Sequence, residues 1–457
     1  MNWQPETSAT GTYEMPPKWV FYAALLPVLA AIIGFGGVYS YIWVPVDLVI
    51  MLAACALILQ TVWQKRPLIW NPLMAPVLGF GLLVFLQWRG RFSVYPGATL
   101  TEMIQLAGCG AVFYLGLSAG RDPRNQQRFS LILWWFTGAI VTEALFQFFN
   151  ANGLIFWFHD ASYATPIGPY VYRNHYAGCI DLLLPLVLAS AFSRETLADP
   201  AWVTWMRRSI VPAMAFASVV LARSKGGVGT LFFEGMLTMV VFWPDIKRRI
   251  HARTVVLICV LMLGSFSILA NWSPILQRFG TLQQHDPSLI DRLTVSHVCL
   301  EIFKDHRWMG TGFNTFATVY PAYQTFDNGR VWLYAHNEYA QMLSETGILG
   351  AGCIAAFIGI WLSLFWKCRQ RRKGGWNSYS IQLAEFIATA GLMFHSFVDF
   401  QFHAPANALL FFLLCGMAAA AVLHERSSFR FDSLPAHEPR RGRAKVSMLT
   451  RSSVSDR

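Results

Sequence analysis

The sequence predicts an all-α, polytopic membrane protein with about twelve transmembrane helices and one large loop on the outer side of the membrane. Two features of the composition support this fold class. Hydrophobic residues make up 55% of the 457 residues and charged residues only 13%, whereas soluble domains carry about 25% charged residues. Aromatic residues reach 15%, and Trp and Tyr collect at membrane interfaces. A water-soluble globular enzyme, a disordered chain and a small disulfide scaffold are therefore excluded.

The individual spans follow from the apolar runs. A membrane-spanning helix needs about 20 mostly apolar residues. The predicted spans are residues 19–37, 44–63, 68–88, 99–119, 129–149, 175–193, 204–222, 227–243, 254–271, 346–366, 381–400 and 405–423. Mostly polar residues precede the first run, which is itself long enough to span, so we expect no cleavable signal peptide.

The positive charges predict the orientation of the spans. With the N-terminus inside, 26 of the 36 Lys and Arg lie on the inner side and 10 on the outer side, and positive charge marks the cytoplasmic side. Both termini are therefore expected to be cytoplasmic. The net charge of +11 is mainly a topology signal and does not indicate nucleic acid, although the basic cluster in the tail is also suited to contact anionic membrane lipid.

The longest predicted connection lies on the outer side, and loops of this length are usually functional. Asp286 and Pro287 predict a helix start, the Gly310-Thr311-Gly312 triplet predicts a break, and a second helix is expected to begin near His336. The predicted division is a cytoplasmic N-terminus (1–18), nine spans (19–271), the large loop (272–345), three spans (346–423) and a basic, disordered cytoplasmic tail (424–457).

Acidic residues inside the predicted spans indicate a polar cavity. Asp47, Glu143, Asp181 and Glu234 fall toward the outer half of their spans, and the ten outer cations face them. Because intramembrane acids usually mark a cavity, we expect one that opens outward, is lined by Arg and Lys, and suits an anionic substrate such as a lipid phosphate. The alternative is that each acid pairs with a structural Arg.

Five stretches between residues 170 and 420 carry motifs that belong together. They are Arg173-Asn174-His175-Tyr176-Ala177-Gly178; Ala222-Arg223-Ser224-Lys225-Gly226-Gly227; Asp291-Arg292 with Gly310-Thr311-Gly312-Phe313-Asn314; AHNEYAQMLSETGILG from Ala335 to Gly350; and His395-Ser396-Phe397-Val398-Asp399-Phe400 with Pro405-Ala406-Asn407. In this order they resemble the O-antigen ligase and Wzy-type polymerase superfamily. The fourth stretch is the most specific of the five.

The resemblance implies a bacterial inner-membrane glycosyltransferase whose large loop and active site face the periplasm. It implies transfer of a glycan from undecaprenyl diphosphate to an acceptor hydroxyl, which belongs to lipid A–core in ligases and to a lipid-linked or growing glycan in O-antigen or exopolysaccharide polymerases. The reaction is expected to need no metal and no cofactor and to invert the anomeric carbon. Sequence does not separate ligase from polymerase.

His336 and Arg292 are the candidate catalytic residues. His336 is the candidate general base, since an imidazole titrates near neutral pH. Its neighbour Glu338 lies two positions on and so points elsewhere on a helix, which makes it a poor partner for His336. Arg292 matches an arginine of the family, and guanidinium groups bind phosphate oxygens in bidentate fashion. The alternative for His336 is a structural role at a helix start.

Other cations are expected to complete a diphosphate site. In the second motif the family has Arg where this chain has Lys225, and Arg223 stands two residues earlier. Lys supplies a point charge and lacks the bidentate geometry of a guanidinium group. The sequence therefore leaves open whether Arg223 or Lys225 contacts phosphate. Arg173 and Arg330 are further candidates, with snorkelling at the interface as the alternative for Arg173.

Metal and disulfide chemistry are not expected. His395, Asp399 and His403 fall at i, i+4 and i+8, which would form a ligand stripe on a continuous helix. Pro405 marks a break just beyond, so a hydrogen-bonded cluster joining the last two spans is favoured. The eight Cys form no CxxC pair, which argues against zinc and disulfides.

Two further alternatives concern the glycines and the function class. The glycines at 226, 227, 310 and 312 are predicted to serve close packing and turns, because no P-loop register follows them. A transporter or flippase for charged lipid-linked glycans would have the same composition. Transporters commonly show two related halves, whereas this chain shows no repeat and one asymmetric outer loop, which favours the enzyme.

Overall fold

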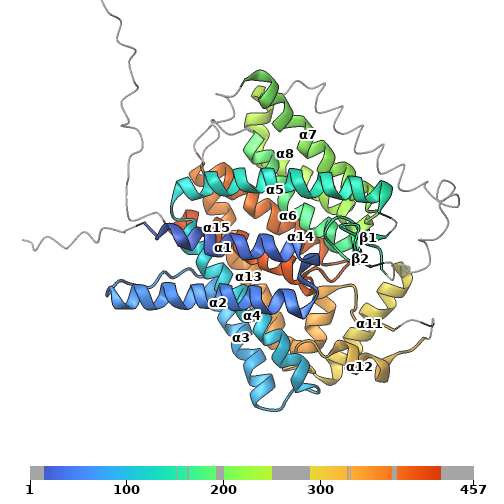
Figure 1. Cartoon of the computed structure of the whole chain (residues 1–457). Coiled ribbons are helices and arrows are strands. Elements are labelled where there is room, and N and C mark those ends of the chain that lie inside the picture. Colours follow the sequence, from blue (N-terminus) through green and yellow to red (C-terminus); the bar gives the residue numbers. More distant parts are fainter. Residues whose placement is uncertain are drawn as a thin grey trace, which may run out of the picture.

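The described part of the chain is almost entirely helical (Figure 1). The computed structural model describes residues 15–151, 153–161, 164–191, 200–249, 289–326, 329, 331–372 and 378–423. Within these described residues, five helices are long and apolar enough to cross a membrane: Ser40–Trp63, Pro96–Ala119, Pro123–Asn150, Lys225–Trp243 and Glu338–Arg371. A helical, multi-pass membrane protein is thereby confirmed. The ninth predicted span, residues 254–271, and most of both predicted cytoplasmic termini lie outside the described residues.

The elements follow the predicted spans closely. They are α1 (Lys18–Ile33), η1 (Phe35–Gly37), α2 (Ser40–Trp63), α3 (Met74–Arg89), α4 (Pro96–Ala119), α5 (Pro123–Asn150), β1 (Leu154–Ile155), β2 (His159–Asp160), α6 (Arg173–Ala191), α7 (Ala201–Leu221), α8 (Lys225–Arg249), α11 (Leu289–Asp305), α12 (Phe316–Tyr323), α13 (Glu338–Arg371), α14 (Ser378–His395), η4 (Gln401–His403) and α15 (Pro405–Leu423). The third span was predicted to begin at residue 68, but α3 begins at Met74 because Pro72 disfavours helical backbone in the residue before it.

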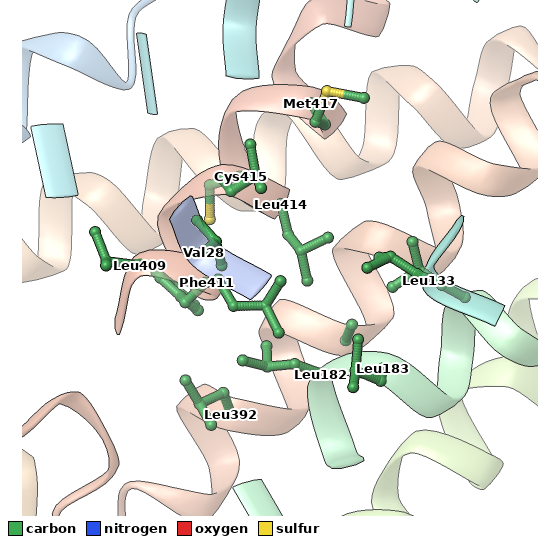
Figure 2. Packing of buried hydrophobic residues seen from close by; sticks show 14 of the residues in the cluster. Val28, Leu133, Leu182, Leu183, Leu392, Leu409, Phe411, Leu414, Cys415 and Met417 are labelled. Atoms are coloured by element: carbon green, nitrogen blue, oxygen red, sulfur yellow. The ribbon is translucent and has the colours of Figure 1, made fainter. Parts of the chain in front are cut away.

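The core of the bundle is apolar and closely packed. Helix α15 packs against α4, and α14 packs against α6 and α8. Gly116 of α4 and its C-cap Gly120 lie against the backbone of Leu413 and Met417 in α15, as small residues allow in membrane helix pairs. Figure 2 shows part of this core, with Val28 of α1, Leu133 of α5, Leu182 and Leu183 of α6, Leu392 of α14, and Leu409, Phe411, Leu414, Cys415 and Met417 of α15.

Helices α11 and α12 form a small unit beside the start of α13 (Figure 1). Val295, Ile302, Phe316 and Tyr320 are among the residues of its own buried cluster. The helical content predicted for the large loop is therefore confirmed over its described part. The predicted helix start at Asp286 and Pro287 lies outside the described residues, and α11 is described from Leu289.

Helix α13 begins two residues after His336 and continues, across a kink at Gly347, into the apolar span. Asn337 caps it, since its side chain accepts a hydrogen bond from the Ala340 N–H, a favoured capping arrangement. Gly347 kinks the helix with a φ of 63°. A Cβ on Gly310 would collide with the Glu345 backbone, and one on Gly347 with the Trp308 carbonyl. The predicted packing and turn role is thus confirmed for Gly310.

Candidate functional site

His336 lies at the end of the bundle where α6, α13 and α15 begin. Its φ is 53°, a left-handed conformation that is uncommon outside glycine and is retained where the surroundings enforce it. The ring packs against Phe400, with centroids 4.8 Å apart, and meets Trp332 edge to face. Its side chain is 17% exposed. A strained, ordered imidazole that still reaches solvent is suited to exchange a proton with a substrate.

Asp399 is the hydrogen-bond partner of His336. The Nδ1 of His336 lies 3.1 Å from Oδ1 of Asp399, which also accepts from the Phe400 N–H. Burial favours the neutral form of Asp399, but the hydrogen bond and charge of His336 and the charge of Arg292 hold its pKa well below its usual range. The carboxylate is therefore ionised at neutral pH. Helical spacing concealed this partner, because α14 ends at His395.

Arg292 lies beside the His336–Asp399 pair. Helix α11 carries it, and its Nη1 donates to the Val398 carbonyl over 2.7 Å, one residue before Asp399. Arg292 and His336, far apart in sequence, are thus brought into one cluster. A guanidinium in this position is suited to bind an anion next to the histidine.

Arg173 and Arg223 form a second group of cations. Arg173 begins α6, and Arg223 stands in the turn between α7 and α8 with a φ of 57°. Burial, together with the positive charge of Arg173, lowers the pKa of Arg223, so the two guanidinium groups lie close together. Lys225 is exposed at the start of α8. Arg330 lies outside the described residues.

The first turn of α6 is held close to His336 by the fifth motif. His175 packs its ring on Phe400, with centroids 4.8 Å apart, and the same Phe400 contacts His336. Gln401 Nε2 donates to the Asn174 carbonyl over 3.0 Å, and Asn407 Nδ2 donates to the His175 carbonyl over 2.9 Å. These bonds fix the start of α6, and therefore Arg173, near the His336–Asp399 pair.

The predicted cluster of His395, Asp399 and His403 is hydrogen-bonded, but each member reaches a different element. The partners are Asp181 for His395, His336 for Asp399 and Glu338 for His403. His395 is thereby bonded to α6, Asp399 to the segment before α13, and His403 to α13 itself. The three residues therefore connect the last two spans to other elements more than to each other. Among the described residues, no group of three or more His, Cys, Asp and Glu is arranged to hold a metal ion.

Acidic side chains surround His403, on another side of the start of α13. Its Nδ1 lies 3.0 Å from a Glu338 carboxylate oxygen, and Glu338 also accepts from the Phe402 N–H. Burial opposes a charge on His403, but Glu338, Glu102 and Glu345 together raise its pKa to about 10. The partner of Glu338 is therefore His403, which the sequence did not predict. Glu338 does not bond to His336, as expected, although the reason is that His336 precedes the helix and not its spacing on one.

Glu345 and Glu102 connect this acidic group to the loop before α12. Glu345 accepts hydrogen bonds from the N–H groups of Asn314 and Phe316. The Asn314 side-chain amide donates to Glu102 of α4 over 3.0 Å. The later part of the third motif therefore fastens α12 and the loop before it to α4 and α13.

The cavity beside these acids differs from the predicted one. It lies between α2, α3, α4, α13 and α15, and its lining includes Asp47, Glu102 and Glu338 but, within the described residues, no Arg or Lys. The prediction of a cavity lined by cations is thus wrong for this cavity. The cations gather near His336 instead, because α6, α11 and the α7–α8 turn supply them, whereas α2, α4 and α13 supply the acids.

The fold and the site define a class: a multi-pass membrane protein with a His–Asp pair beside clustered guanidinium groups. Comparison with known proteins identifies the family that this chain resembles. Residues 210–355 match the family model described as O-antigen ligase, Wzy_C. The matched stretch contains Arg223, Lys225, Arg292 and His336, so the predicted resemblance is confirmed and supports an O-antigen ligase- or polymerase-type glycosyltransferase in general. No curated protein matches the chain.

Proposed function

We propose that this protein is a bacterial inner-membrane glycosyltransferase that transfers a glycan from undecaprenyl diphosphate to an acceptor hydroxyl. The observation that carries the proposal is the position of Arg292 beside the His336–Asp399 pair. Arg292 and His336 both lie in the stretch that matches the O-antigen ligase family. The acceptor is a lipid A–core sugar if the protein is a ligase, and a lipid-linked or growing glycan if it is a polymerase.

The proposed reaction is a single displacement at the anomeric carbon. The acceptor hydroxyl gives its proton to His336 while its oxygen forms a bond to the anomeric carbon. The bond from that carbon to the diphosphate oxygen breaks, and its electron pair leaves with the lipid diphosphate. Asp399 orients the imidazole and stabilises its protonated form, as a buried carboxylate does in other acid–base pairs. Attack opposite the leaving group inverts the anomeric centre.

The leaving diphosphate gains negative charge, and the cations are proposed to stabilise it. Fixed cations near developing charge lower a barrier. Arg292 is the principal contact because it lies next to the His336–Asp399 pair. Arg173 and Arg223, which lie close to each other, are the next contacts, with Lys225 and Arg330 as further ones. The reaction needs no metal in this proposal, since the diphosphate is already a good leaving group.

The proposed topology places this site in the periplasm. Twelve spans, a periplasmic loop at residues 272–345 and cytoplasmic termini at residues 1–18 and 424–457 agree with the distribution of Lys and Arg. The starts of α6, α13 and α15 then share the periplasmic side with α11 and α12. Labelling of single-cysteine variants with a membrane-impermeant reagent in intact spheroplasts tests this. The His297→Cys variant is expected to react, and reaction only after lysis would reverse the topology.

Reconstitution tests the function. The purified protein, in liposomes with a polyprenyl-diphosphate-linked glycan and lipid A–core, is expected to form a glycosylated acceptor, and activity is expected to persist in EDTA. Activity that is lost in EDTA and restored by a divalent ion would contradict metal independence. Movement of lipid-linked glycan between leaflets without transfer to an acceptor would contradict the proposed glycosyltransferase and indicate a flippase.

A deletion strain separates ligase from polymerase. Loss of all O-antigen from lipid A–core indicates a ligase. Lipid A–core capped with a single repeat unit, or loss of a secreted exopolysaccharide, indicates a polymerase.

A further inference from the structure

Gln401 is buried at the point where α6, α14 and α15 meet beside the candidate base. It is the first residue of η4, stands two positions after Asp399, and is fully buried. Its amide Nε2 donates to the Asn174 carbonyl over 3.0 Å and lies 3.3 Å from Nε2 of His395. Its Oε1 accepts from Nδ2 of Asn407 over 3.0 Å. One side chain therefore connects the starts of α6 and α15 with the end of α14.

The contacts of Gln401 determine which way its amide points. An amide side chain has two N–H donors and one carbonyl acceptor, and the nitrogen faces both the Asn174 carbonyl and Nε2 of His395. The reversed amide would set its oxygen against that carbonyl and its nitrogen against the amide nitrogen of Asn407. Nε2 of His395 is therefore the acceptor of a hydrogen bond from Gln401.

His395 continues the connection to the middle of α6. Its Nδ1 lies 2.8 Å from Oδ2 of Asp181, and both side chains are fully buried. Since Nε2 accepts from Gln401, the ring hydrogen is on Nδ1 and is donated to the Asp181 carboxylate. Because neither side chain reaches the surface, this second His–Asp pair holds α14 against α6 and does not contact a substrate.

Helix α8 packs on the same residues through a glycine. A Cβ on Gly226 would collide with the His395 ring, so α8 approaches this ring as closely as glycine allows. Gly226 follows Lys225, the first residue of α8. A Cβ on Gly178 of α6 would likewise collide with the Gln401 amide. The starts of α6 and α8, which carry cations of the proposed diphosphate site, thus both pack on the contact between Gln401 and His395.

We propose that Gln401 is a positioning residue of the glycan transfer: its amide sets the place of Arg173 relative to Asp399 and the base that Asp399 orients. This inference rests on the proposed function. Arg173 directly precedes Asn174, whose carbonyl accepts from Gln401. Asp399 lies two residues before Gln401 in the connection between α14 and α15. The side chain of Gln401 fixes the separation of these two places, and a misplacement of about 1 Å can lower a reaction rate about 10²-fold.

A double-mutant cycle tests whether Gln401 acts through Arg173. Gln401→Met removes the amide hydrogen bonds at nearly constant volume, and Arg173→Ala removes the cation. In the full-length protein in nanodiscs, Gln401→Met is expected to weaken binding of farnesyl diphosphate about tenfold in the wild-type background, and less than about twofold in the Arg173→Ala background. Equal weakening in both backgrounds means that the two residues act independently, and it overturns the proposal.

Gln126→Met is the matched control. Gln126 is also fully buried, and its amide also donates to a backbone carbonyl, that of Met417, over 3.0 Å at the opposite end of the bundle. The control is expected to lower the thermal midpoint and to leave diphosphate binding, kcat and KM unchanged. Gln401→Met is expected to lower kcat about 10²-fold and to raise the KM for the donor, while the KM for the acceptor stays constant. Equal kinetics of the two variants would show that the role of Gln401 is structural only.

Gln401→Glu covers the case in which Gln401→Met does not fold. The carboxyl group keeps the shape of the amide but has at most one hydrogen to donate, so the Asn174 carbonyl and Nε2 of His395 cannot both receive one from it. Its effect on binding of farnesyl diphosphate is expected to be about threefold larger in the wild-type background than in the Arg173→Ala background. Equal effects in both backgrounds overturn the proposal here as well.

Binding of farnesyl diphosphate separates this proposal from the proposed function, because binding needs no catalysis. If the wild type transfers no glycan but the coupling to Arg173 is found, the transferase is wrong and Gln401 still positions a cation of an anion site. If transfer occurs without the coupling, the transferase stands and Gln401 is structural. If the wild type neither binds the probe nor transfers glycan, both proposals fail.

Discussion

Two neighbouring regions at the start of α13 carry opposite charge. On one, Arg292 lies against the segment that holds Asp399, the partner of His336. On the other, Glu338 and two further carboxylates surround His403. The two regions begin only two residues apart in sequence. His336 and the N-cap Asn337 precede the helix, and His336 has a φ of 53°. One short motif can therefore direct the imidazole toward the cations and Glu338, the first residue of α13, toward the acidic region.

The difference teaches how one end of a helix bundle can divide its work between two sides. A diphosphate is attracted to guanidinium groups and repelled by carboxylates. The cationic region should therefore govern chemistry and donor binding, and the acidic region should govern structure.

The largest expected effect in this comparison comes from His336→Ala. Removal of the base is expected to lower turnover about 10²- to 10⁴-fold, with little change in donor binding. The measurement is single-turnover glycan transfer alongside binding of the lipid-diphosphate donor. His297→Ala removes an imidazole that is 71% exposed on α11 and is the control with unchanged turnover. Near-normal turnover of His336→Ala would show that this histidine is not the base and that its role is structural.

Arg292→Ala is expected to lower transfer about 10²- to 10³-fold, the range found when a donor to a developing anion is removed. Arg292→Lys keeps the positive charge but loses the bidentate hydrogen bonding of the guanidinium group, so it should recover only part of the activity. The assay is kcat/KM for the donor, with membrane insertion checked by fractionation. Arg307→Ala, at an exposed arginine that bonds the Lys304 carbonyl, is the control. If Arg292→Ala and this control are equally active, Arg292 does not take part in the reaction.

Asp399→Asn is expected to lower kcat about 10²-fold, because a small misplacement of a catalytic group has that effect, while the KM of both substrates stays constant.

The depressed pKa of Asp399 gives a second readout. Its carboxylate stabilises the fold above the unfolded-state pKa of about 3.9 and loses this contribution only as pH falls through the lower folded value. The difference in thermal midpoint between wild type and variant should therefore stay constant from pH 5 to 8, and a difference that disappears within this range would refute an ionised partner.

The sequence predicted the helices and singled out His336 and Arg292, which the structure brings into one cluster, but it did not predict the way the charges are sorted. Apolar runs locate spans because each helix must satisfy its backbone within the membrane, and motif resemblance located His336 and Arg292. Asp399 was missed as the partner of His336 because helical spacing linked it to His395 and His403, while the chain leaves the helix at His395. Asp47 was expected to line a cavity and does so, but its grouping there with Glu102 and Glu338 was missed, because the three are far apart in sequence and only tertiary packing joins them.

The smallest effect on activity is expected on the acidic side, from His403→Gln. In the wild type the pKa of His403 is raised from 6.5 to about 10, so its ion pair with Glu338 stabilises the fold fully below pH 6.5 and loses this contribution as pH rises through 10. The thermal midpoint of the wild type should therefore exceed that of the variant at pH 6.5 by several degrees, and the two should converge above pH 10. His297→Gln, at the exposed histidine, should show no such convergence. Parallel midpoints from pH 6.5 to 10.5 would mean that His403 is neutral in the fold, and the acidic region would then lack the cation that holds its carboxylates together.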